Sequence, residues 1–97
     1  MQNADITPAL IEQWKKEHGK VFVAKADGKT AYYRKPTRKD LSYAMTLKKQ
    51  PLDMDEALLR GCFLGGEPLH EDLDYLLGMD RLVDHMLTVK KIEVGEA

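Results

Sequence analysis

The chain has 97 residues, of which 43% are hydrophobic and 32% are charged; this length allows one hydrophobic core, and this composition excludes a disordered chain. No apolar run approaches the roughly 20 residues of a membrane span, and the first residues lack the basic start and apolar stretch of a signal peptide. Cys62 is the only cysteine, so an intrachain disulfide is excluded and a reducing cytoplasm is the simplest setting. We expect a single soluble domain over residues 1–97, with no membrane contact.

Charge is divided unequally between the two halves of the chain. Residues 1–50 carry eleven Lys and Arg against five Asp and Glu, a net charge of +6. Residues 51–97 carry four against eleven, a net charge of −7, so the overall charge of −1 hides the division. Such a difference in net charge between the two halves is a hint about the kind of partner that the protein binds.

The first predicted element is a helix over residues 8–18. Thr7 is placed to accept a hydrogen bond as N-cap, and Pro8 occupies the first helical position, where its missing N–H is not needed. Gly19 follows as the expected left-handed terminator. The apolar stripe of this helix consists of Leu10, Ile11, Trp14 and His18.

A β-hairpin follows, with strands over residues 20–26 and 29–34. The turn Asp27-Gly28 favours type I′, in which both central residues need positive φ. A two-residue turn pairs Val23 with Tyr32 and Phe22 with Tyr33, so one face carries Val21, Val23, Tyr32 and Arg34 and the other carries Phe22, Ala24, Ala31 and Tyr33. Both faces are partly apolar, so we expect helices on one face and leave the other open to a partner.

The remainder of the chain is predicted to be helical. Thr37 and Asp40 have the spacing of a cap and a first-turn carboxylate, and the helix that they begin, with Leu41, Ala44, Met45 and Leu47, ends before Pro51. Asp53 is predicted to cap a second helix.

Gly65-Gly66 is predicted to break this second helix. Residues 71–92 form the last helical segment, with Gly78 as a break or a close-packing point. The class is therefore α+β: an N-terminal helix, a β-hairpin and a C-terminal half of about three helices, in the order α-β-β-α-α-α.

The residues that commonly bind metals or act in catalysis do not form a recognisable site. The three histidines and the cysteine lie on four separate elements, without the close spacing of zinc ligands: His18, Cys62, His70 and His85. Cys62 lies on an apolar stripe and is expected in the core. The acidic cluster of residues 71–74 is expected to be a first helical turn that the helix dipole stabilises. We predict no catalytic residue, no metal site and no cofactor.

Residues 32–39 place two tyrosines beside four cations. Two stacking rings among Lys and Arg are typical of single-stranded nucleic-acid binding. Against this, the isoelectric point is near 6.3, and alternate residues of a strand face opposite sides. We favour a solvated basic surface or a patch that contacts an acidic protein, and keep a small regulatory or nucleic-acid-associated protein as the alternative.

Three strings, at residues 14–21, 27–38 and 58–66, together resemble small phage and prophage proteins known as tail assembly chaperones. The resemblance covers most of the chain and rests on the order of elements and on these strings. It implies a non-catalytic protein of the bacterial host cytoplasm that keeps the long helical tape-measure protein soluble during virion assembly.

A partner-binding site follows from this resemblance as a hypothesis. We predict contact with the tape-measure protein, or self-association, through the junction between the hairpin and the next helix. The residues predicted to make this contact are Tyr32, Tyr33, Arg34, Arg38 and Phe63. Trp14 is a further candidate, for which a place in the core is the favoured interpretation.

Overall fold

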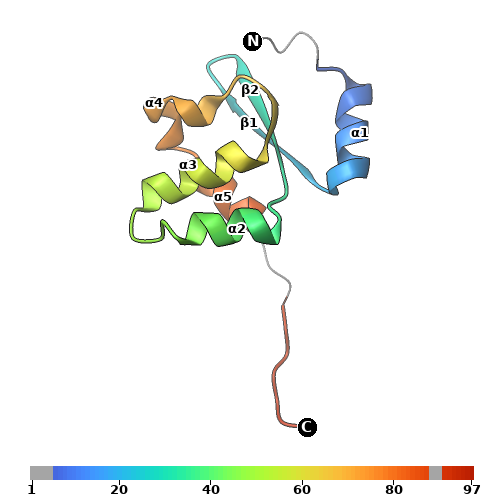
Figure 1. The fold of residues 1–97 in the computed structure, drawn as a ribbon. Coiled ribbons are helices and arrows are strands. Elements are labelled where there is room, and N and C mark those ends of the chain that lie inside the picture. The colour runs from blue at the N-terminus through green and yellow to red at the C-terminus, as the bar shows by residue number, and fades with distance from the viewer. Residues whose placement is uncertain (1–5, 88–90) are drawn as a thin grey trace.

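The computed structural model describes residues 6–87 and 91–97 and confirms the α+β class (Figure 1). Its elements in chain order are α1 (Pro8–His18), β1 (Val21–Ala26), β2 (Lys29–Arg34), α2 (Arg38–Met45), α3 (Pro51–Cys62), β3 (Phe63–Gly66), the 3₁₀ turn η2 (Leu69–Glu71), α4 (Leu73–Leu76) and α5 (Asp80–Met86). Among these residues, no helix has the length and apolar character needed to cross a bilayer.

The local signals at the start of the chain are confirmed. The Leu10 N–H donates a 3.2 Å hydrogen bond to Thr7 Oγ1 at the start of α1. Asp27 and Gly28 have φ values of 52° and 77°, as a type I′ turn requires. Consequently β1 and β2 pair in the predicted register, with Val23 opposite Tyr32.

The third strand is a feature that the sequence pattern did not predict. The described residues form an antiparallel sheet of order β1-β2-β3, in which β3 begins directly after α3. The prediction that Gly65-Gly66 breaks the second helix is wrong, because α3 already ends at Cys62 and both glycines lie within β3. Gly65 lies directly against the Trp14 ring: a Cβ at this position would be 3.1 Å from Trp14 Cη2. Two glycines in four residues remove the alternation of side chains by which strands are recognised.

Two predicted helix boundaries are wrong. The second helix begins at Pro51, not after an Asp53 cap, because proline is suited to the first helical position. Asp53 instead lies in the first turn of α3, where its charge suits the helix dipole.

The predicted segment over residues 71–92 is divided at Gly78, one of the two roles expected for this glycine. Asp72 caps the short α4, a turn at Leu77-Gly78 follows, and α5 ends at Met86. Residues 88–90 of this prediction lie outside the described residues, and residues 91–97 form no helix.

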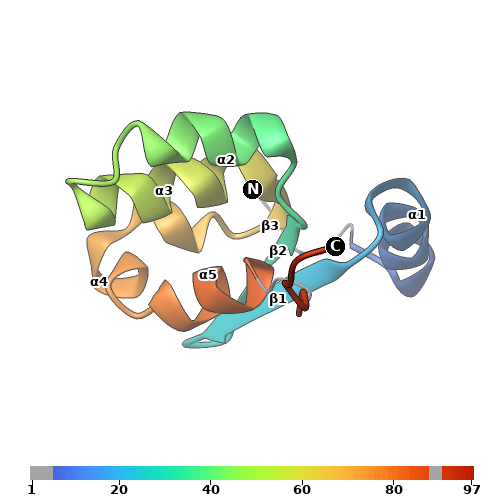
Figure 2. The ribbon, with the colours of Figure 1, turned by 90° about the horizontal axis from the view of Figure 1, so that it is seen from below.

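The core lies on one side of the sheet, between the sheet and the helices α3 to α5 (Figure 2). Ala31 and Tyr33 of β2 face this core, whereas α1 stands apart from the other helices, against the opposite face (Figures 1 and 2). The buried apolar residues are Ala31, Tyr33, Ala44, Leu58, Leu59, Cys62, Leu69, Leu76, Met79, Val83 and Met86.

Candidate protein-binding surface

The junction between β2 and α2, predicted as a contact site, is built around Arg34. Its Nη1 donates a 2.6 Å hydrogen bond to Asp40 Oδ2, and its Nη2 donates one of 2.6 Å to the Gly61 carbonyl oxygen in the last turn of α3. That carbonyl is one of those that a helix end leaves without an intrahelical partner. Gly61 allows this close approach, because a Cβ there would be 3.3 Å from Asp40 Oδ1. Arg34 therefore joins β2, α2 and α3.

Asp40 completes the junction as part of a capping box. Its Oδ2 accepts hydrogen bonds from the Thr37 N–H at 2.8 Å and the Thr37 hydroxyl at 2.9 Å, and the Asp40 N–H donates to Thr37 Oγ1. The hydrogen bond from Arg34, with those from Thr37, lowers the pKa of Asp40 to about 2. The same pairing raises the pKa of Arg34. The charges of Arg34 and Asp40 are therefore paired with each other within the fold.

Tyr33 and Phe63, also predicted as contact residues, lie in the interior with His70. Tyr33 is fully buried, and Phe63 packs against the core with its ring centroid 5.6 Å from that of Tyr33. The Tyr33 hydroxyl is 2.9 Å from His70 Nδ1. Burial raises the pKa of Tyr33 and lowers that of His70, so both are neutral near pH 7. The hydroxyl therefore donates to Nδ1, and the imidazole proton is on Nε2. Tyr33 has no exposed surface for a partner.

Tyr32 lies on the opposite face of the sheet, against α1. Its ring centroid is 5.7 Å from that of Trp14, and both side chains are half-buried. Because Tyr32 and Tyr33 alternate across the strand, the two rings cannot stack on one ligand. The structure thus separates the paired tyrosines on which the nucleic-acid interpretation depended.

Arg38 is exposed, and of the five predicted contact residues it is the one beside an open surface. A groove of about 170 Å³ runs between the start of α2 and the end of α5. We call it the α2 groove; it is lined by Lys35, Pro36, Thr37, Arg38, Leu41, Met86 and Leu87. Its apolar floor is bordered by the cations of Lys35 and Arg38, both of which are exposed.

The surface of α2 extends this groove. Leu41, Tyr43 and Met45 are exposed by 38%, 61% and 48%, whereas Ala44 faces α3 and is buried. Leu41 and Met45 are four residues apart and therefore lie on one face of the helix. The helical spacing of the apolar residues in the sequence did not reveal that, within α2, Ala44 alone would be buried. This surface is the one that sequence analysis missed.

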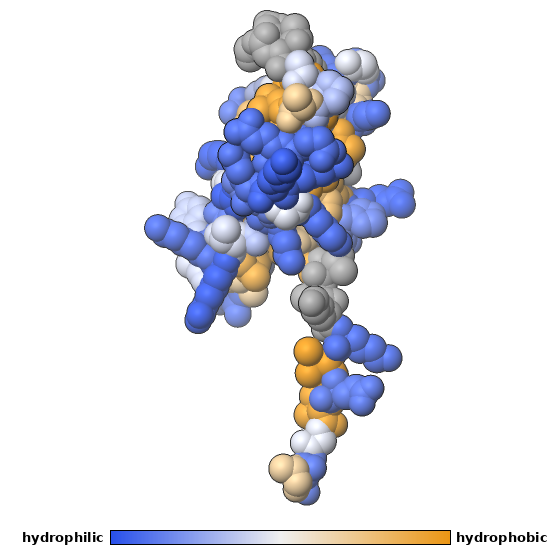
Figure 3. Space-filling model, turned by 90° about the vertical axis from the view of Figure 1, so that its right-hand side faces the viewer, coloured by the Kyte–Doolittle hydropathy of each residue, from blue (hydrophilic) through white to orange (hydrophobic). Residues whose placement is uncertain are grey.

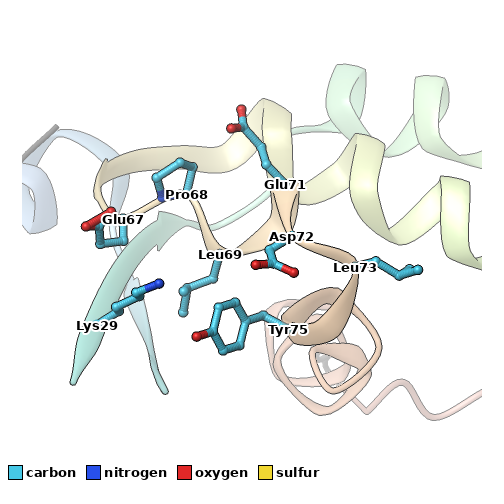
Figure 4. Close-up of a pocket in the computed structure, with 8 residues that line it drawn as sticks. All are labelled: Lys29, Glu67, Pro68, Leu69, Glu71, Asp72, Leu73 and Tyr75. Atoms are coloured by element: carbon cyan, nitrogen blue, oxygen red, sulfur yellow. The ribbon is translucent and has the colours of Figure 1, made fainter. Parts of the chain in front are cut away.

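A second hollow, of about 440 Å³, lies between β2 and the segment from Glu67 to Tyr75. Figure 4 shows Lys29 reaching from β2 toward Leu69 and Tyr75, with Glu71 turned away. Lys29 Nζ lies 5.3 Å from the Tyr75 ring centroid, and the Tyr75 hydroxyl donates a 2.8 Å hydrogen bond to Asp27 Oδ2. These contacts hold the hairpin turn against α4, which is a structural role.

Residues with metal-binding or nucleophilic side chains are dispersed in the structure. Within residues 6–87 and 91–97, no three of the His, Cys, Asp and Glu side chains are placed to bind one metal ion. Cys62 is buried, as predicted, with its Sγ 3.9 Å from Asp40 Oδ2. Burial raises the pKa of the Cys62 thiol to about 11, which keeps it protonated and weakly nucleophilic at neutral pH.

The sequence and the fold were both compared with known proteins. No family model, curated protein or solved structure matches the chain.

Proposed function

We propose that this chain is a non-catalytic protein-binding factor of the cytoplasm that acts in assembly, as the tail assembly chaperones that it resembles do. The observation that carries the proposal is the face of α2 on which Leu41 and Met45, four residues apart, are both exposed. Neighbouring apolar side chains exposed in this way are typical of protein-interaction sites.

The shape of this surface suits an apolar helix face on the partner. Leu41 and Met45 form a short ridge beside the α2 groove, and methionine adapts its shape to different partner side chains. A tape-measure protein, the partner that the resemblance implies, is rich in long helices that offer such apolar stripes. The cations of Lys35 and Arg38 favour acidic residues beside the stripe. The proposal assigns no catalytic step and no cofactor to the chain.

The nucleic-acid alternative receives less support from the geometry. Tyr33 is buried, Tyr32 contacts Trp14, and Arg34 is paired with Asp40. A stacking site for bases would need at least two exposed rings beside free cations.

Co-expression tests the proposal. The tagged chain is produced with the long helical protein encoded nearest to it, and capture of that protein is measured. The double variant Leu41→Asp/Met45→Asp is expected to reduce capture at least about tenfold, because two apolar contacts are replaced by charges that the partner must desolvate. The control Leu77→Asp changes an exposed leucine of the turn after α4 and is expected to leave capture unchanged.

The outcomes separate the candidates. Equal loss of capture in both variants would show that the effect is not local to α2, and no capture by the unchanged chain would count against the assembly function. Salt-sensitive binding of labelled single-stranded DNA at micromolar concentration would favour the alternative.

A further inference from the structure

The β1 strand is an edge of the sheet that the described residues form. Ala26 and Lys29 flank the two-residue turn and therefore form a hydrogen-bonded pair, as do Ala24 and Phe22 with their partners. The N–H and C=O groups of Val21, Val23 and Lys25 consequently point away from β2. No backbone hydrogen bond within residues 6–87 and 91–97 reaches this edge. The edge is a template for a further strand.

A groove of about 400 Å³ lies beside this edge, between β1 and the segment from α4 to α5. We call it the β1 groove. Its apolar lining includes Ala24 and Ala26 of β1 with Met79 and Leu82 from the other wall. The two alanines are small, so they leave room for larger side chains on an added strand.

The C-terminal segment, residues 91–97, has the pattern of such a strand. Ile92 and Val94 are β-branched and alternate with Glu93. They are exposed by 73% and 91%, and the segment runs away from the domain (Figure 1). Figure 3 shows its apolar atoms standing clear of the body. Two large apolar side chains in this position gain by burial elsewhere.

We propose that the C-terminal segment of one copy adds as a strand to β1 of a second copy, and that the two copies exchange segments. With Glu93 opposite Lys25, a strand in either direction places Ile92 and Val94 beside Ala24 and Ala26, facing the β1 groove. Glu93 then lies on the other face, next to the ammonium of Lys25.

Charge fits the C-terminal segment to the β1 edge, and the placement of the segment favours a second copy as the occupant. The β1 edge carries the exposed Lys25, with Lys20 and Lys29 at its ends, and the segment carries Glu93 and Glu96 against the single cation Lys91. Opposite charges on adjacent strands stabilise the pairing. Residues 91–97 extend away from the body in Figure 1, and Ile92 and Val94 are exposed, so the segment is not seated on the β1 edge of its own domain.

The oligomeric state of the full chain tests the proposal. Sedimentation velocity over a range of concentrations is expected to show a monomer–dimer equilibrium. Ile92→Asp/Val94→Asp is expected to weaken dimerisation at least about tenfold, because it places two charges in the apolar groove. The control Gly95→Ala, whose added Cβ meets nothing within 4 Å, is expected to dimerise normally. A monomer at every concentration, or a dimer unaffected by the double variant, would overturn the proposal.

Cysteine cross-linking identifies the occupant. Lys25→Cys and Glu93→Cys are prepared as separate single variants, mixed and oxidised. A disulfide-linked heterodimer in the mixture, beyond the background of each variant alone, is expected; Cys62 is buried and serves as the internal control. If the variant that carries both changes instead gives a cross-linked monomer, the segment binds its own domain and exchange is wrong.

Discussion

Replacing Asp40 by Asn tests the junction that joins β2, α2 and α3. Asn retains the size of the side chain and an oxygen that can accept from Thr37, so the change removes mainly the charge opposite Arg34. The pKa of Asp40 falls from 3.8 to about 2 in the fold. Each pKa unit corresponds to about 1.4 kcal/mol, so we expect a loss of about 2 kcal/mol in the free energy of unfolding at pH 7.

The difference in stability between the wild type and Asp40→Asn is expected to decrease as the pH falls. A carboxyl group whose pKa is depressed in the fold contributes stability above its unfolded pKa and loses it as the pH falls through the folded value. The advantage of the wild type over Asp40→Asn is therefore complete above about pH 4 and declines between about pH 4 and pH 2. Urea unfolding of both proteins at pH 7, 5, 4 and 3 measures this difference, and the variant serves as its own pH-independent reference at this position.

Glu12→Gln provides the matched control. Glu12 and Lys15 form an exposed ion pair with a 3.6 Å separation, whereas only 19% and 17% of the Arg34 and Asp40 side chains are exposed. An exposed pair contributes at most about 1 kcal/mol. A loss below about 0.5 kcal/mol for Asp40→Asn, or a difference that stays constant down to pH 3, would refute the role assigned to this charge pair.

Two further substitutions test the two faces of the sheet. Tyr33→Phe leaves His70 Nδ1 buried without its donor, so urea unfolding at pH 7.5 should show a loss of about 1–3 kcal/mol; an unchanged midpoint would contradict the hydrogen bond. Gly65→Ala should displace the Trp14 ring, whose Cη2 would be 3.1 Å from the new Cβ, and shift the emission of this single tryptophan. Gly95→Ala is the control for that shift, and identical spectra for both variants would mean that Trp14 does not rest on Gly65.

The elements specified by neighbouring residues were predictable from the sequence. Thr7 and Pro8 fix the start of α1, and Asp27-Gly28 fixes both the turn and the register of the hairpin. The capping box at Thr37 was visible from its spacing. Each of these signals acts within four residues, so no tertiary information was needed.

The parts that depend on distant residues were not predictable. Both faces of the hairpin are partly apolar, so the pattern could not decide that Tyr33 faces the core and Tyr32 faces α1. His70 is 37 residues from Tyr33 in the chain, and no local signal indicates their hydrogen bond. The sequence left open whether Gly78 is a break or a close-packing point, because the leucine spacing continues across it; the chain turns there to bring α5 against α3 and β1.

The attachment of α1 has a consequence for the motions of the domain. No residue of this helix, which the structure describes throughout, is fully buried, and its aromatic anchor rests on a glycine. A helix with so little buried surface opens at a lower free energy than the core against which it rests. The amide protons of α1 should therefore exchange with solvent before those of α3. Its opening uncovers Tyr32 and the second face of the sheet while the core of Tyr33, Leu59 and Cys62 stays folded.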